Sequence, residues 1–138
     1  VHSILGMEKA LEIAISSIEK DTVYISELKK YFISELQSNF KNIAFNGNSE
    51  SLEKSSYTIL NVRFSNANDM LLFSLDLNGI AVSGGSACQS GSNKGSHVLE
   101  EILAKTEADK TSVRFSFSKN TTKQEIDSTI IKLKELLI

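Results

Sequence analysis

The sequence contains a single cysteine, and it has neither proline nor tryptophan. One cysteine cannot form a disulfide within the chain, and no charged-then-apolar leader precedes the first predicted helix. We therefore expect a free thiol in a reducing, cytoplasmic compartment. No apolar run approaches the roughly 18 residues of a membrane-spanning helix, which argues against a membrane role. Lysines alternate with glutamates and the net charge is −2, so we expect no nucleic-acid partner.

The apolar content is sufficient for one folded domain. Hydrophobic residues make up 41% of the 138 residues, and a chain of this length hides roughly two thirds of its unfolded surface on folding. The chain begins VHSILGMEKAL, with valine in place of methionine and an apolar pattern already under way. We therefore expect residues 1–138 to be a single domain of a longer protein.

Helical patterns fill the first 41 residues. Apolar side chains recur at three- and four-residue steps from residue 6 to about 20 and again from about 22 to 41, with Asp21 between the two stretches. A polar stretch at 46–56 reads as a surface loop. TILNVRFS (58–65) then alternates apolar and polar side chains, the period of a strand with one buried face.

Helix and strand signals alternate through the rest of the chain. Side-chain oxygens precede each predicted helix, where they can accept hydrogen bonds from its first backbone N–H groups. The predicted elements are a helix over 69–77 capped by Asn68 and stopped by Asn78-Gly79, a short strand at 80–83, a helix that begins at Ser96, a strand at 111–119, and a last helix opened by the capping box TKQE at 122–125.

Strands that alternate in polarity indicate a sheet with helices on one face only. The predicted class is therefore α/β in its two-layer α+β form, with a small three- to four-stranded sheet. The uncovered face would carry Asn61, Arg63, Arg114 and Ser116. That face would meet water or another domain.

Cys88 stands in SGGSACQSGSNKGS, residues 83–96, which contain four glycines and five serines. Such a backbone samples many conformations, so we predict a mobile loop that keeps the thiol accessible. An accessible thiolate can act as a nucleophile or as a sulfur carrier. Three other interpretations are a small buried cysteine, a metal site shared with His97, and a phosphate cradle formed by GSNKGS.

Arg114 is the second candidate site residue. In SVRFSFS the large apolar side chains at 113, 115 and 117 point one way, and Arg114 points the other way between Ser112 and Ser116. Small neighbours leave space for a carboxylate, which a guanidinium can hold with two parallel hydrogen bonds. The alternative is a solvated strand arginine paired with a nearby acid. That description suits Arg63 better, because small residues do not flank it on both sides.

These residues also carry a resemblance to a known family. VSGGSACQSGS and SHVL, followed some fifteen residues later by SVRFSFSKNTTKQEID, are similar to the C-terminal part of cysteine desulfurases. VHSILGMEKALEIA and ILNVRF resemble stretches of that family in the same order. In this branch of the class V aminotransferases the persulfide cysteine lies in an S-[SG]-G-S-A-C segment.

The resemblance implies the C-terminal small domain of a fold-type I pyridoxal-phosphate enzyme that converts L-cysteine to L-alanine. Cys88 would be the nucleophile and persulfide carrier, and Arg114 would bind the substrate carboxylate. The whole enzyme would be a homodimer that passes sulfur to an acceptor such as an iron–sulfur scaffold, for cluster assembly or tRNA thiolation. In the family the cofactor lysine precedes this domain, so we expect this chain alone to hold no cofactor, no metal and no activity.

The sequence departs from the family at a few positions. Gly84 stands where many relatives have serine, Gly95 where many have proline, His97 replaces a tyrosine, and Ser118-Lys119 replace Gly-Arg. These changes bear on the sulfur acceptor and on the order of the loop. Two other functions stay open: another class V aminotransferase or selenocysteine lyase in which Cys88 is incidental, and a non-catalytic module whose Gly/Ser arm binds a protein.

Overall fold

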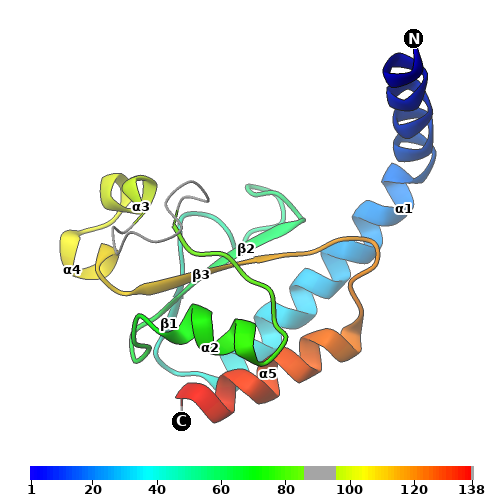
Figure 1. The fold of residues 1–138 in the computed structure, drawn as a ribbon. Helices are drawn as coiled ribbons and strands as arrows, with labels where there is room; N and C mark the ends of the chain where they lie inside the picture. The colour runs from blue at the N-terminus through cyan, green and yellow to red at the C-terminus, as the bar shows by residue number, and fades with distance from the viewer. Residues whose placement is uncertain (86–95, 138) are drawn as a thin grey trace.

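The computed structural model describes residues 1–85 and 96–137 (Figure 1). Its elements in chain order are α1 (His2–Asn39), β1 (Ile43–Phe45), β2 (Ile59–Phe64), α2 (Leu71–Leu77), α3 (His97–Ile102), α4 (Lys105–Ala108), β3 (Thr111–Ser116) and α5 (Lys123–Leu137). The three strands form an antiparallel sheet in the order β1-β2-β3. None of the helices in these ranges is both long and apolar enough to cross a bilayer.

The core lies between one face of the sheet and three helices. Alternate residues of the strands are buried on this face, among them Leu60, Val62 and Val113 with no exposed surface. They pack against α2, α5 and the C-terminal half of α1, which lie beneath the strands in Figure 1. The arrangement confirms the predicted two-layer α+β class, because the alternation of the strands places their apolar side chains against helices.

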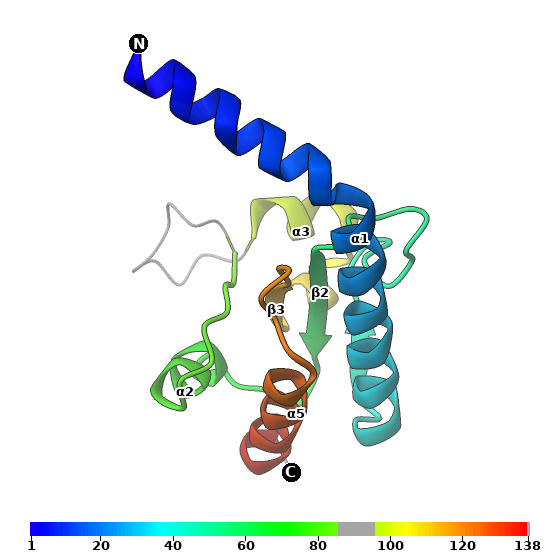
Figure 2. The ribbon, with the colours of Figure 1, turned by 90° about the vertical axis from the view of Figure 1, so that its right-hand side faces the viewer.

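Residues 2–39 form one continuous helix, so the prediction of two separate stretches is wrong. Neither proline nor an internal glycine interrupts the chain between Gly6 and Gly47, and the Ser17 Oγ donates to the Asp21 Oδ2 at 2.8 Å within the helix. Figure 2 shows that α1 changes direction between a projecting half and a packed half. Ser16 and Ser17 donate hydrogen bonds to the Ile13 carbonyl, a contact that often accompanies helix bends.

Two strand assignments also differ from the sequence prediction. β1 has three residues, too few for a visible alternation, and it pairs with β2 through Ile43 opposite Phe64. The strand predicted at 80–83 is wrong except at its last residue. Ser83 alone forms a β-bridge, with Arg114.

Three of the four predicted signals at helix ends are confirmed. The N-cap predicted at Asn68 is wrong, because α2 begins at Leu71 after Met70, and the Asn68 Oδ1 accepts, among the described residues, only from the Met70 N–H at 3.0 Å. The Leu99 N–H donates to the Ser96 Oγ at 3.4 Å, and Gly79 takes the left-handed φ of +77° after α2. At the start of α5 the Thr122 N–H donates to the Glu125 carboxylate at 2.7 Å, and the Glu125 N–H donates to the Thr122 Oγ1 at 3.2 Å. This is the reciprocal pair of a capping box.

Candidate functional site

Arg114 lies on β3 with its side chain on the face opposite the core, as predicted, since its neighbours Val113 and Phe115 are buried. Ser83 forms hydrogen bonds with both the backbone and the side chain of Arg114. The Arg114 N–H donates to the Ser83 carbonyl at 2.7 Å, and the Arg114 Nε donates to the Ser83 Oγ at 3.1 Å. In the described ranges no residue contacts the terminal nitrogens Nη1 and Nη2 through a hydrogen bond or ion pair. Within these ranges, the planar end of the guanidinium thus keeps its donors for a ligand.

Arg114 lines a cavity of about 310 Å³. Its polar lining comes from four parts of the chain: β2, β3 and the two segments around Ser83 and Ser96. The strand pairing brings two of them together, because Asn61 on β2 lies directly opposite Arg114 on β3. Ser112 lines the cavity beside them, so one of the two small neighbours predicted for Arg114 does leave space for a ligand. Ser116 lies outside the lining.

Both ends of the predicted loop reach the same cavity. Gly85, the last described residue before the gap, and Ser96, the first after it, line the cavity together with His97. Cys88 and the other residues of 86–95 lie outside the described residues. The fold thus brings both ends of the Cys88 segment to the cavity that contains Arg114.

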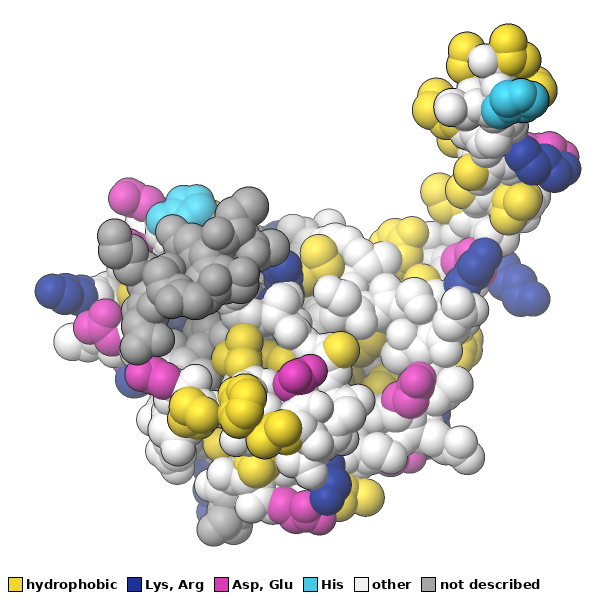
Figure 3. All heavy atoms as spheres, in the orientation of Figure 1, with side chains coloured by type: hydrophobic (Ala, Val, Ile, Leu, Met, Phe, Trp, Pro, Cys, Tyr) yellow, Lys and Arg dark blue, Asp and Glu magenta, His cyan; other side chains and the backbone are white. Residues whose placement is uncertain are grey.

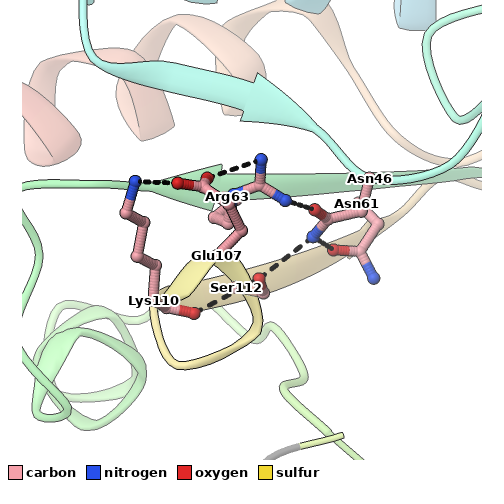
Figure 4. A network of polar contacts seen from close by, with 6 residues as sticks. All are labelled: Asn46, Asn61, Arg63, Glu107, Lys110 and Ser112. Atoms are coloured by element: carbon pink, nitrogen blue, oxygen red, sulfur yellow. Dashed lines mark hydrogen bonds and ion pairs between the residues drawn. The ribbon is translucent and has the colours of Figure 1, made fainter. Parts of the chain in front are cut away.

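A buried polar network lies beside this cavity (Figure 4). Arg63 on β2 is only 8% exposed, and its Nη2 pairs with the Glu107 Oε2 on α4 at 2.9 Å. Arg63 thus has the acidic partner that the sequence predicts, but the prediction of a solvated side chain is wrong. Glu107 lies 44 positions further along the chain, and no local pattern of β2 reveals that α4 covers Arg63.

The network continues from Arg63 to the cavity through two asparagines. The Arg63 Nη1 donates to the Asn46 Oδ1 at 2.6 Å, and the Asn46 Nδ2 donates to the Asn61 Oδ1 at 2.9 Å and to the Ser112 Oγ at 3.0 Å. Asn61 lies on the predicted face of the sheet, but the alternation of its strand indicates no role for it. Asn46 follows β1 directly and leaves no sequence signal, because β1 is itself too short to detect.

Glu107 is the anionic end of the network. A hydrogen bond from Lys110, with the charges of Lys110 and Arg63, holds the pKa of the Glu107 carboxyl below its usual value against the opposing effect of desolvation. The group is therefore charged at neutral pH and keeps Arg63 in place. No cluster of three or more histidine, acidic or cysteine side chains suited to a metal occurs in the parts of the chain that are described.

Among the described residues, several large apolar side chains are exposed together on each of two surfaces (Figure 3). One is the projecting half of α1, where Ile4 is 72% and Met7 73% exposed and the stripe continues through Leu11, Ile15 and Ile18. The other is α2, where Met70, Phe73 and Leu77 are exposed. Apolar surface on this scale marks places where another part of a protein packs.

Comparison with known proteins identifies the family of this chain. The family model for class-V aminotransferases matches residues 1–129. The chain belongs to the class-V aminotransferase family. The family resemblance predicted from the sequence is thereby confirmed.

Several relatives of this class-V chain are cysteine desulfurases. It is 36% identical over 140 residues to the cysteine desulfurase IscS of Dictyoglomus turgidum, covering 99% of this chain and 34% of that protein. It is 39% identical over 130 residues to the IscS of Buchnera aphidicola, covering 94% of this chain and 31% of that one. A solved NifS-like protein superposes with a TM-score of 0.78 at 26% identity, over 97% of this chain and 33% of that structure. The chain thus spans about a third of the length of the relatives it matches.

Proposed function

We propose that this chain is the C-terminal small domain of a cysteine desulfurase, an enzyme that converts L-cysteine to L-alanine and retains the sulfur as a cysteine persulfide. The observation that carries the proposal is the cavity of Arg114, to which both ends of the Cys88 segment lead. Identities of 36% and 39% to cysteine desulfurases over nearly the whole chain support the same assignment.

Arg114 would bind the substrate carboxylate. Its Nε is engaged by Ser83, so the orientation of the guanidinium is set before a ligand arrives. The terminal nitrogens of a guanidinium that lines a cavity can donate parallel hydrogen bonds to the two oxygens of a carboxylate. The site therefore suits an amino acid substrate, whose carboxylate would be fixed while chemistry occurs at its other end.

Cys88 would accept the sulfur. It follows Gly85 by three residues, so chain length alone limits the distance between their Cα atoms to about 11 Å. In the proposed reaction the Cys88 thiolate forms a bond to the substrate sulfur, and the bond between that sulfur and the substrate β-carbon breaks. The β-carbon keeps the electron pair and takes a proton to give alanine, and Cys88 carries the persulfide.

Pyridoxal phosphate, which the resemblance implies for the whole enzyme, would supply the electron-accepting group for this reaction. It requires a lysine amine for attachment, and no lysine lines the Arg114 cavity within residues 1–85 and 96–137. The described residues do not by themselves fit the cofactor. We propose that the remaining two thirds of the longer protein supplies its site.

The exposed apolar surfaces of α1 and α2 support the proposal that this chain packs against the rest of a longer enzyme. Side chains such as Met7 on α1 and Phe73 on α2 would pack against the rest of the longer enzyme. We further propose that the whole enzyme is a cytoplasmic homodimer and that it passes sulfur to an acceptor protein such as an iron–sulfur scaffold, for cluster assembly or tRNA thiolation.

The test of the proposed function uses the full-length enzyme, L-cysteine and a Cys88→Ser variant. The unsubstituted enzyme should release alanine and accumulate sulfane sulfur on Cys88, detected by mass spectrometry of the peptide that contains it. Cys88→Ser should lose the sulfane sulfur and the sulfide release, because serine cannot form a persulfide. Ser90→Ala, in the same segment, is the control and should behave as the unsubstituted enzyme. A Cys88→Ser enzyme that releases sulfide at the normal rate would overturn the role.

A further inference from the structure

Asn61 shares the cavity with Arg114 and lies directly opposite it across β2 and β3. Residues opposite each other in an antiparallel pair have Cβ atoms about 5 Å apart on the same face. A ligand held by Arg114 is therefore within reach of the Asn61 amide. The functional effect of that amide depends on which of its two ends, oxygen or nitrogen, is presented to the ligand.

The hydrogen-bond chemistry of the network determines that orientation. A guanidinium can only donate, so the atom of Asn46 that contacts the Arg63 Nη1 at 2.6 Å must be its oxygen. The other end of Asn46 is then its NH₂ group, which can only donate, and it contacts Asn61 at 2.9 Å. The contacting atom of Asn61 must therefore be its oxygen. One donor-only cation thus orients two amides in series.

The Asn61 Nδ2 is the end that remains. Figure 4 shows this nitrogen pointing away from Asn46, and it has no hydrogen-bond partner among the residues that the structure describes. This NH₂ group, with two hydrogens, and the Arg114 guanidinium belong to residues that lie opposite each other and line the same cavity. Both groups can only donate, so together they select an acceptor with more than one oxygen.

The network is poorly explained as a source of stability. Arg63 is buried, and its Nε has no hydrogen-bond partner within the described ranges. A buried guanidinium with an unmet donor is costly, and a buried ion pair is weak evidence for stabilisation. The orientation that Arg63 imposes on the Asn46 and Asn61 amides accounts for its burial better than a gain in stability does.

We infer that Asn61 is a second carboxylate-binding residue beside Arg114, and that Glu107, Arg63 and Asn46 act as positioning residues that turn its NH₂ group toward the substrate. The inference rests on the proposed function and deepens it, since it assigns the recognition of an amino acid carboxylate to both strands of the site. Asn61 would touch substrate, whereas the other three residues act through it.

Two substitutions test this in the full-length enzyme. Asn61→Asp keeps the oxygen that Asn46 contacts and replaces the donor by a charged acceptor. Asn46→Asp keeps the acceptor for Arg63 but cannot donate, so the Asn61 amide should turn its NH₂ group to Asp and its oxygen to the cavity. Each substitution should raise the KM for L-cysteine by about 10- to 100-fold, the scale of a lost hydrogen bond to a charged group. For Asn46→Asp, the melting temperature should stay at or above that of the unsubstituted enzyme.

Equilibrium binding of L-alanine, measured by calorimetry on the same proteins, should weaken by a similar factor in both variants. Asn120→Asp, on the exposed turn before α5, adds the same charge away from the cavity. It should change neither the KM for L-cysteine nor the affinity for L-alanine. If the unsubstituted enzyme binds L-alanine without turning over L-cysteine, the proposed function fails while the carboxylate site stands. An unchanged KM and an unchanged L-alanine affinity in Asn61→Asp would overturn the inference, as would an unsubstituted enzyme that does not bind L-alanine. If Asn46→Asp fails to fold, Asn61→Asp decides alone.

Discussion

At the scale of single residues, Arg114 differs from an ordinary surface arginine in being oriented without a ligand. Its backbone pairs with Ser83 in both directions, at 2.7 and 3.2 Å, and its Nε donates to the Ser83 hydroxyl. The loss of side-chain entropy is a large part of the free-energy cost of binding. The contact with Ser83 already orders the Arg114 side chain before a ligand binds. The free end of the guanidinium then contributes most of its hydrogen-bond energy to affinity.

Replacing Arg114 by alanine should therefore weaken L-cysteine binding by about 1.5 to 3 kcal/mol, the scale of hydrogen bonds to a charged group. The measured effect would be a KM increase of roughly 10- to 150-fold. Arg114→Lys should recover only part of it, because an ammonium lacks the planar fork. Lys134→Ala, an exposed cation on α5, is the control. Unchanged KM and kcat in Arg114→Ala would show that the residue is only a surface charge.

Sequence patterning distinguishes Arg114 from Arg63 only in part. Both point away from the core by the alternation of their strands. Of the two serines that flank Arg114, Ser112 lines the cavity and Ser116 does not, so the flanking pattern indicates the space beside Arg114 only in part. The burial of Arg63 depends on Glu107 and Asn46, which reach it from α4 and from the end of β1. Contacts between segments distant in sequence leave no periodic signal, so the network next to the site is visible only in the structure.

At the scale of elements, α1 and α5 are joined by a polar contact as well as by their apolar faces. The Tyr31 hydroxyl on α1 donates to the Asp127 Oδ1 on α5 at 2.6 Å, and the Lys123 Nζ lies 4.3 Å from the centroid of the Tyr31 ring. The hydrogen bond to Asp127, desolvation, and the negative charges of Asp127 and Glu35 raise the pKa of Tyr31 to about 12. Folding thus favours the protonated phenol.

The raised pKa gives a pH dependence of known sign. The folded pKa lies above the ordinary value of about 10, so the stabilisation is fully present below pH 10 and is lost as the pH rises toward 12. The difference in free energy of unfolding between the unsubstituted protein and Tyr31→Phe should therefore be constant up to pH 10 and narrow above it. Denaturant titrations at a series of pH values measure this difference.

Asp127→Asn sharpens that experiment, because asparagine can still accept from the phenol but carries no charge. The difference in free energy of unfolding between Asp127→Asn and Tyr31→Phe should then stop narrowing below pH 12. A difference between the unsubstituted protein and Tyr31→Phe that stays constant from pH 8 to 12 would show that the contact with Asp127 does not persist in solution. Other alkaline titrations, such as that of the buried Lys29, whose pKa is lowered by desolvation, are common to all three proteins and largely cancel.

The elements that sequence predicts well are those whose signals are local. β2 and β3 alternate in polarity, and the capping box of α5 and the Ser96 cap of α3 depend on residues at most three positions apart. β1 and the continuous path of α1 past Asp21 were not predictable in the same way. β1 exists because β2 offers it an edge, and α1 continues because nothing in its sequence breaks it.

At the scale of the whole molecule, the shape of α1 is difficult to explain from this chain alone. A helix of 38 residues is about 57 Å long, and only its C-terminal half packs on the core. Figures 1 and 2 both show the N-terminal half projecting without contact to the strands. Helical stability in proteins comes mostly from packing of an apolar face, and here that face is exposed through Ile4, Met7 and Leu11.

The exposed apolar stripe of α1 can be tested for a packing partner in the whole enzyme. If it packs against the rest of the longer enzyme, Ile4→Gln, Met7→Gln and Leu11→Gln should each lower the free energy of unfolding of the full-length enzyme by about 1.5 to 3 kcal/mol, the value of a buried apolar side chain. Glu8→Gln and Glu12→Gln, on the same half of the helix, are the matched controls. Effects within about 0.5 kcal/mol for all five variants, measured by denaturant unfolding, are those of free surface positions and would show that the stripe stays exposed in the whole enzyme.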